Sequence, residues 1–198
     1  GQDPAVPELA ELLALFAGAL RELGRWLDAG FGGRFEGPVE AAGGSAERLA
    51  ELLATMPFYQ DVHRYEEIPV PLYKRAQIVP ADLALAFGGE GFGRFDDLDR
   101  LTIFPDNLVP HVLRRLGVLE YDAALAARIA REELLPVGSP EEIEIRALAV
   151  HAVERLVAAL ADRGVRSSAR ELDQLLWVQG QDPEIKAHPR HRTRTVYY

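Results

Sequence analysis

The sequence predicts an all-α fold in a single helical domain that spans residues 1–198. Apolar side chains recur at steps of three and four residues in several segments, which places them on one face of a helix. We find no sustained alternation of apolar and polar residues of the kind typical of a strand, and no internal repeat. With 198 residues, 48% of them hydrophobic, the chain is long enough to close a core, and we expect about seven or eight helices.

The first predicted helix carries apolar residues at helical spacing and ends near Gly30. The glycine-rich stretch 31–44 is predicted to be a loop, and Ser45 is placed to cap a short helix after it. Prolines and aromatic residues interrupt any period over 57–71, which predicts a second loop. The apolar residues of the first helix are Leu9, Leu12, Leu13, Phe16, Leu20, Leu23 and Leu27.

Pro80 lies within the next helical segment, 72–87. Because proline lacks an amide hydrogen and clashes with the preceding turn, we expect a kink or two separate helices there. The stretch 95–106 shows no period of either kind. Asn107 is placed to cap a further helix, which ends at Gly117.

A capping box opens the longest predicted helix. Ser139 is the cap, a proline follows it, and Glu142 is the reciprocal partner. The apolar period of this helix continues to Gly164. A last helix is predicted to begin at Ser167 or Ser168.

Charge and composition exclude several classes of function. The net charge of −9 argues against binding to duplex nucleic acid, which needs a broad basic face. The absence of cysteine excludes disulfides, thiolate metal sites and a cysteine nucleophile. We find neither an apolar run long enough to span a bilayer nor an N-terminal signal pattern, so we expect a cytoplasmic protein with no membrane partner.

Metal and nucleotide cofactors are also unsupported by the sequence. None of the five histidines forms the i, i+4 pair with an intervening glutamate that binds zinc on a helix, so we expect no metal. No glycine-rich loop leads from a strand into a helix, which argues against a bound dinucleotide or nucleoside triphosphate. Carboxylate and lysine chemistry remains.

Two charged residues stand out by position. Lys74 lies beside Tyr73 at the start of a helix, although it could simply belong to a solvated face. Asp106 follows Phe104 and precedes a predicted helix N-terminus, whose amides would stabilise its anionic form. On position alone it could equally be a cap. Basic residues gather at 186–194, which composition alone describes as a solvated tail.

The last two helices carry further polar candidates. Glu144 and Arg146 are two residues apart, so they face different directions and each needs a partner elsewhere. Asp173 and Trp177 are one helical turn apart and share a face. A tryptophan at such a position is more often part of a core than a stacking platform.

Read in order, these segments resemble the queuosine salvage protein family, the queuosine 5′-phosphate N-glycosylase/hydrolases. The resemblance runs from about Ser45 to Tyr198 and extends weakly back to the first helix. No single motif decides it, but six motifs in the family order, ending on a double tyrosine, make a specific combination. The motifs are YKRAQI at 73–78, FDDLDRLTIFPD at 95–106, VPHVLRRLGVLEY at 109–121, EIEIRA at 142–147, LDQLLW at 172–177 and HRTRTVYY at 191–198.

The resemblance implies a helical fold related to helix-hairpin-helix DNA glycosylases, acting without metal or organic cofactor on queuosine 5′-monophosphate to release queuine. It also implies a catalytic role for Asp106 and a supporting active-site role for Lys74. The chain departs from the family pattern at Pro105 and Asn107, where alanine and tyrosine are common, and these changes could shift substrate contacts. The N-terminal third of the family pattern is absent, so we expect either a separate N-terminal fragment or a truncated chain.

In the implied reaction a carboxylate stabilises the oxocarbenium-like transition state or activates water. The 7-deazaguanine base has no N7 to protonate, so catalysis must depend more on electrostatics. A buried carboxylate is needed to accept from the base edge, and we place Asp173 first, ahead of Asp97 and Glu144. We expect Arg192 and Arg194 to hold the phosphate and Tyr198 to pack the tail onto the body. The other substrate-binding candidates are Tyr73, Phe104, Arg146, Trp177 and Tyr198 itself.

Two other functions remain open at this point. The chain could be a non-catalytic helical module that binds queuine or its nucleotide without turnover, which the missing third would explain. It could also excise bases from DNA, as the related fold suggests, although the acidic net charge opposes this.

Overall fold

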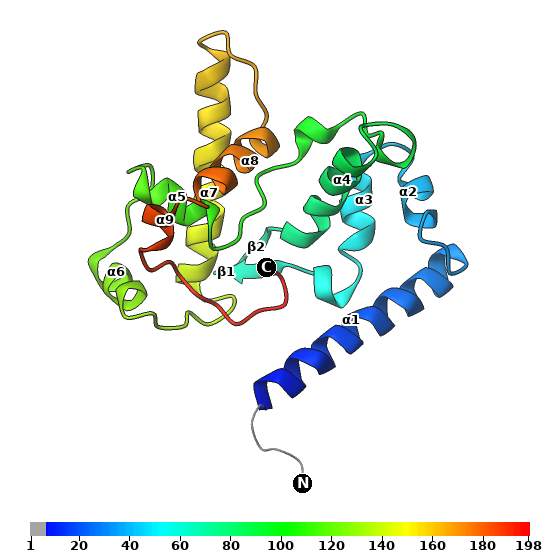
Figure 1. Cartoon of the computed structure of the whole chain (residues 1–198), viewed down its shortest axis with the longest axis horizontal. Coiled ribbons are helices and arrows are strands. Elements are labelled where there is room, and N and C mark those ends of the chain that lie inside the picture. Colours follow the sequence, from blue (N-terminus) through cyan, green and yellow to red (C-terminus); the bar gives the residue numbers. More distant parts are fainter. Residues whose placement is uncertain (1–6) are drawn as a thin grey trace.

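The computed structural model describes residues 7–198, a mostly helical chain with one two-stranded sheet (Figure 1). The predicted helical character is confirmed, and the first six residues of the predicted domain lie outside the described range. The α-helices are α1 (Pro7–Phe31), α2 (Gly37–Ala42), α3 (Ala46–Leu53), α4 (Lys74–Ala86), α5 (Val109–Arg115), α6 (Ala123–Ala130), α7 (Pro140–Ala161), α8 (Ala169–Gln179) and α9 (Pro183–Lys186). The strands are β1 (Val62–Tyr65) and β2 (Ile68–Pro71), and the short 3-10 helices are η1 (Pro57–Tyr59), η2 (Gly91–Gly93) and η3 (Leu98–Arg100).

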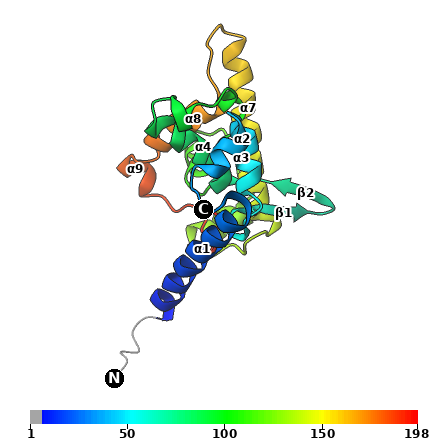
Figure 2. The ribbon, with the colours of Figure 1, turned by 90° about the vertical axis from the view of Figure 1, so that its right-hand side faces the viewer.

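The helix α1 extends away from the rest of the protein along its first half (Figures 1 and 2). Near its C-terminal end Leu27 is 4% exposed, and Leu23 packs against the core formed by α2, α3 and α4. Closer to the N-terminus, Leu13 and Leu20 are 59% and 69% exposed. Within the described residues, the apolar stripe that predicts this helix is therefore covered only along its second half.

The helices α2, α3 and α4 enclose the first hydrophobic core. The short helix α2 lies within 31–44, so the prediction of a loop there was wrong. It spans six residues, too few to show a period, and begins with Pro38 in its first turn. Ser45 caps α3 as predicted, because its Oγ accepts from the Arg48 amide at 3.1 Å. The buried residues of this core include Leu49, Leu53, Met56, Ala76, Phe95 and Phe104.

The strands β1 and β2 form an antiparallel hairpin, which corrects the prediction of a loop over 57–71 and of a fold without strands. Val62 pairs with Pro71, and Tyr65 pairs with Ile68. A proline cannot donate to a strand ladder, so prolines in four-residue strands hide the pattern that identifies a strand. Both strands of this two-stranded sheet are edge strands, and edge strands tolerate proline.

The helix α4 continues through Pro80 as one element, so the division into two helices that we considered does not occur. The residue before it, Tyr73, has a left-handed φ of 48°. Few non-glycine residues adopt this conformation, and a bulky residue keeps it only where its surroundings hold it.

The helices α5, α7 and α8 enclose a second core, and α6 packs on a smaller third cluster around Leu135 and Ile145. The prediction omitted α6, a helix of eight residues. The prediction that Asn107 caps α5 was wrong, because the Asp106 carboxylate takes that role. The second core contains Ile103, Val109, Val112, Leu113, Ala149, Val153 and Leu176.

The complete capping box that we predicted for α7 is found at the N-terminus of α8 instead. Ser139 Oγ accepts from the Glu142 amide at 3.4 Å, but the Glu142 carboxylate accepts from Gly138 N at 3.1 Å rather than from Ser139. The predicted capping box of α7 is therefore only half present. A complete box opens α8, where Ser168 and Glu171 cap each other.

The C-terminal segment 187–198 packs on the body of the protein and runs from α9 toward the hairpin (Figure 1). The Leu135 amide donates to the Arg192 carbonyl at 2.8 Å, and the His191 side chain is 1% exposed. The segment is therefore packed on the body, although the side chains of His188, Arg192 and Arg194 are exposed.

Candidate active site

Lys74, Asp106 and Asp173 lie near one another at the junction between the two groups of helices, which we call the seam. Lys74 is the first residue of α4, Asp106 lies just before α5, and Asp173 is on α8. The charges of Lys74 and Asp106 both act on Asp173. Three elements that are far apart in sequence thus bring one cation and two carboxyl groups to the same place.

The Asp106 carboxylate is fixed at the N-terminus of α5. Its Oδ1 accepts from the amides of Leu108 at 2.7 Å and Val109 at 3.2 Å. These donors and the helix dipole stabilise the anion. Among the described residues Oδ2 has no hydrogen-bond partner, and the side chain is half-buried. Asp106 is therefore a cap that leaves one carboxylate oxygen available.

Asp173 is the more buried of the two carboxyl groups, at 6% exposed. Its Oδ1 accepts from the Phe104 amide at 2.8 Å. Burial raises the pKa of Asp173 to about 6, and the nearby Asp106 charge acts in the same direction, whereas the Phe104 amide and Lys74 oppose them. The site therefore contains a buried carboxyl group that takes up a proton near neutral pH, and perturbed groups of this kind are common at catalytic sites.

A buried ion network lies behind these groups, with Arg146 at its centre. The Arg146 side chain is completely buried, and its Nη1 donates to Asp61 Oδ1 and to Glu142 Oε1, each at 3.0 Å. Its Nε donates to the Pro105 carbonyl at 2.8 Å. The network therefore holds the backbone immediately before Asp106.

Asp61 connects the same network to α4. Its Oδ2 accepts from the Lys74 amide at 3.3 Å, and its backbone carbonyl accepts from Leu72 N at 2.9 Å. Although burial opposes ionisation, the neighbouring His63 ring and the Arg146 guanidinium hold the pKa of Asp61 below its usual value. The ion pair between Asp61 and Arg146 thus connects the start of α4 to the segment that carries Asp106.

Tyr198 closes the network from the C-terminal segment. The Arg146 guanidinium carbon lies 4.4 Å from the centre of the Tyr198 ring, and the Tyr198 hydroxyl donates to Glu142 Oε1 at 2.9 Å. Tyr198 therefore packs the tail onto the body, which is a structural use of a residue that we listed among the substrate contacts.

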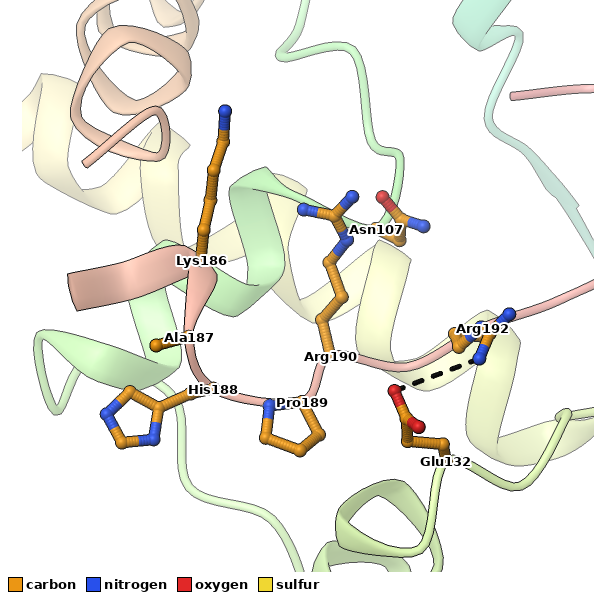
Figure 3. A pocket seen from close by; sticks show the side chains of 8 residues that line it. All are labelled: Asn107, Glu132, Lys186, Ala187, His188, Pro189, Arg190 and Arg192. Atoms are coloured by element: carbon orange, nitrogen blue, oxygen red, sulfur yellow. Dashed lines mark ion pairs between the residues drawn. The ribbon is translucent and has the colours of Figure 1, made fainter. Parts of the chain in front are cut away.

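An open pocket of about 450 Å³ lies beside the seam (Figure 3). Asn107, the residue after Asp106, forms part of its wall. The other lining residues are Glu132, Lys186, Ala187, His188, Pro189, Arg190 and Arg192. The described residues contain no group of three or more histidines and carboxylates able to hold a metal ion. They also contain no helix long and apolar enough to cross a membrane.

Comparison with known proteins identifies the family of the chain. The family model of the queuosine salvage protein matches residues 2–198. The chain belongs to the queuosine salvage protein family. It is 45% identical to a queuosine 5′-phosphate N-glycosylase/hydrolase of Sphaerobacter thermophilus, covering 100% of this chain and 59% of that protein. It is 37% identical to the Dictyostelium discoideum protein of the same name, covering 100% and 60%, and 34% identical to that of Mus musculus, covering 90% and 56%. The chain thus spans about three fifths of the length of these relatives.

Three of the side chains that we predicted to contact the substrate are instead bound to other side chains of the protein. The Asp97 carboxylate caps α3 and accepts from Ser45 Oγ at 2.7 Å. Glu144 accepts from the Tyr65 hydroxyl, and Arg194 pairs with Glu11 on α1. We therefore leave Asp97, Glu144 and Arg194 out of the site proposed below.

The remaining predicted contacts are placed differently from one another. Phe104 is 8% exposed within the first core and contributes its amide to Asp173. Trp177 is 46% exposed, so the interpretation of this ring as a core residue was wrong. Tyr73 is half-buried beside Lys74.

Sequence reasoning missed Asp61 and interpreted Glu142 only as a cap. Asp61 precedes a strand that we read as loop, and its partner Arg146 lies 85 residues away. Glu142 does accept a local amide, but its other oxygen belongs to the ion network. Its four-residue spacing to Arg146 on one helix was the available signal.

Proposed function

We propose that this chain carries the catalytic centre of an N-glycosylase that hydrolyses queuosine 5′-monophosphate and releases queuine. One observation supports the proposal above the others. In a chain of this family, helix amides hold one oxygen of the Asp106 carboxylate while the other oxygen has no protein partner. Such a carboxylate can face a reacting centre without losing its position.

In this proposal the Asp106 anion lies near C1′ of the ribose, where it stabilises the positive charge that develops as the glycosidic bond breaks, or activates water. Lys74 adjusts the charge at the seam or contacts the nucleotide. Asp173 accepts from the guanine-like edge of the base when it is ionised. No metal or organic cofactor takes part. The kinship with helix-hairpin-helix glycosylases and a cytoplasmic location also belong to this proposal.

The test is chromatographic detection of queuine after incubation of the polypeptide with queuosine 5′-monophosphate. The assay is run with the chain alone and with the part of the Sphaerobacter thermophilus relative that lies outside the matched region. Release in either arm supports the proposal. If neither arm releases queuine but the nucleotide binds in calorimetry, the chain is a binding module without turnover.

We also propose that the part of the family pattern outside the matched region, supplied as a separate N-terminal fragment, packs on the exposed stripe of α1. Leu9, Leu13, Phe16 and Leu20 follow a four-three spacing that continues into the buried Leu27, and these four side chains are 49–69% exposed. An exposed apolar stripe of this spacing is the kind of surface that a partner helix covers. The relatives are long enough to supply such a helix, because the matched region is 59–60% of the first two.

We expect the fragment of the Sphaerobacter thermophilus relative to co-elute with this chain in size-exclusion chromatography. The double variant Leu13→Glu, Phe16→Glu should lose the complex, since two charges would be buried between α1 and the fragment. Leu85→Glu is the matched control, because Leu85 is 83% exposed on α4. Co-elution that survives the double variant, or a homodimer of this chain in its place, would contradict the docking proposal.

A separate prediction concerns Asp173→Asn, which keeps an acceptor for the Phe104 amide and removes the buried charge. The pKa of Asp173 is about 6 in the folded protein against an ordinary 3.8, so the folded state binds this proton more tightly than the unfolded state. The stability that this proton contributes is present below about pH 4 and is lost as the pH rises through about 6. The ionised wild-type residue therefore destabilises the fold above that pH.

Urea unfolding should find the variant more stable than the wild type by up to about 3 kcal/mol near pH 8 and by little near pH 4. Queuine release should nevertheless fall, because the neutral amide no longer offers the base a carboxylate. A stability difference that does not vary with pH would exclude the buried ionisable carboxyl that this argument requires.

A further inference from the structure

The pocket that Asn107 lines is basic, although the net charge of the chain is −9. Its wall includes four basic side chains but a single acidic one, Glu132. The basic residues are Lys186, His188, Arg190 and Arg192. An excess of positive charge held in one hollow of an acidic protein favours an anionic ligand.

The charges in this pocket are poorly neutralised by the protein. Arg190 is half-buried, and its guanidinium has no ion-pair or hydrogen-bond partner within residues 7–198. Lys186 Nζ donates to the neutral Gln181 amide oxygen at 2.6 Å. The pair of Arg192 with Glu132 is long, at 3.8 Å, and both side chains are more than half exposed. Such a pair contributes little, so the donors remain available.

The segment that carries these donors is held in place on both sides. His111 Nε2 lies 3.0 Å from the Ile185 carbonyl at one end, and the Leu135 amide binds the Arg192 carbonyl at the other. Between them the ring of His191 is buried. A ligand would therefore meet a wall that is already positioned, which lowers the entropic cost of binding.

The position of the pocket relates it to the proposed reaction. Asn107 lines it and directly follows Asp106, and Figure 3 shows the Arg190 side chain extending toward the part of the wall that Asn107 forms. A nucleotide with its C1′ at Asp106 carries its 5′-phosphate only a few bonds away. A dianion this close to a carboxylate needs cations to offset the repulsion, and the pocket supplies them.

We propose that this pocket is the subsite for the 5′-phosphate of a nucleoside monophosphate, with Arg190 and Lys186 as its principal donors. The proposal rests on the function proposed above. It moves phosphate recognition from Arg194, which is paired with Glu11 on α1, to Arg190 and Lys186, which were not among the predicted substrate contacts. Arg192 stays at the rim of the same subsite.

The test compares hydrolysis of queuosine 5′-monophosphate with hydrolysis of the nucleoside queuosine, in whichever arm of the assay releases queuine. Arg190→Gln and Lys186→Gln should each lower kcat/KM for the nucleotide about tenfold to a hundredfold, mainly through KM, because each removes a charge-assisted bond to phosphate. The nucleoside rate should be unchanged. Arg166→Gln, which replaces an exposed arginine in the loop after α7, should leave both rates unchanged. Equal losses for both substrates, or no loss for either, would overturn the assignment.

Calorimetry with ribose 5-phosphate keeps this test separate from the proposed function. If no queuine is released from either substrate, the glycosylase proposal fails while the pocket can still be judged. Binding of ribose 5-phosphate to the wild type that Arg190→Gln weakens at least tenfold would support an anion site. No binding to the wild type, or equal binding to both proteins, would contradict it.

Discussion

Replacement of Asp106 by asparagine is expected to lower kcat for queuine release by about 10²- to 10³-fold and to leave KM nearly unchanged. The amide keeps an oxygen that accepts from Leu108 and Val109, so the cap of α5 is retained. The variant loses the negative charge that faces the developing cation, and this charge acts only in the transition state. The effect should therefore fall on turnover rather than on binding.

The stability of the Asp106→Asn variant separates the two roles of this residue. Loss of an anion at a helix N-terminus should cost only about 0.3–1 kcal/mol of unfolding free energy, which circular dichroism during urea titration can measure. Asp96→Asn is the matched control, because the Asp96 side chain is 76% exposed. Retention of wild-type turnover by Asp106→Asn would show that the carboxylate is a cap alone and would remove it from the catalytic proposal.

The elements that the sequence predicted well are those set by local pattern. The apolar period of α1 and α7 and the serine caps of α3 and α8 act over one or two helical turns, so each is visible in a short window. The hairpin was missed because Pro69 and Pro71 remove donors from strands of four residues. The helix α2 was missed because six residues are too few to establish a period, whereas α6 was overlooked although the Asp122 side chain caps it.

In the candidate site, too, the sequence predicts what depends on local pattern and misses what depends on tertiary contacts. Asp106 and Asp173 could be proposed from neighbouring residues and from the family resemblance, but their different environments could not. The burial that raises the pKa of Asp173 comes from packing of α8 against the segment that carries Phe104, 69 residues earlier. Likewise, no local pattern pairs Asp61 with Arg146. The groups of a site are visible in sequence, whereas the groups that position them depend on tertiary contacts.

Disruption of the buried ion pair is the second large effect that we expect. Asp61→Asn and Arg146→Met should each lower the unfolding free energy by about 3–5 kcal/mol, because each leaves a buried charge without its main partner. Arg64→Met, which breaks an exposed pair with Glu67, should cost less than about 1 kcal/mol. Urea titrations of the three variants at one pH provide the comparison.

The pH dependence distinguishes a lost ion pair from simple loss of packing. In the wild type the pKa of Asp61 is lowered, so its stabilisation is present at neutral pH and is lost as the pH falls through its folded pKa. In Arg146→Met, burial without the arginine should raise the pKa of Asp61, so this variant should instead lose stability as the pH rises. A deficit that stays constant from acid to neutral pH would mean that Arg146 acts by filling space. In that case the ion pair would not be the interaction that positions Lys74, at the start of α4, relative to Asp106, which follows the Pro105 carbonyl.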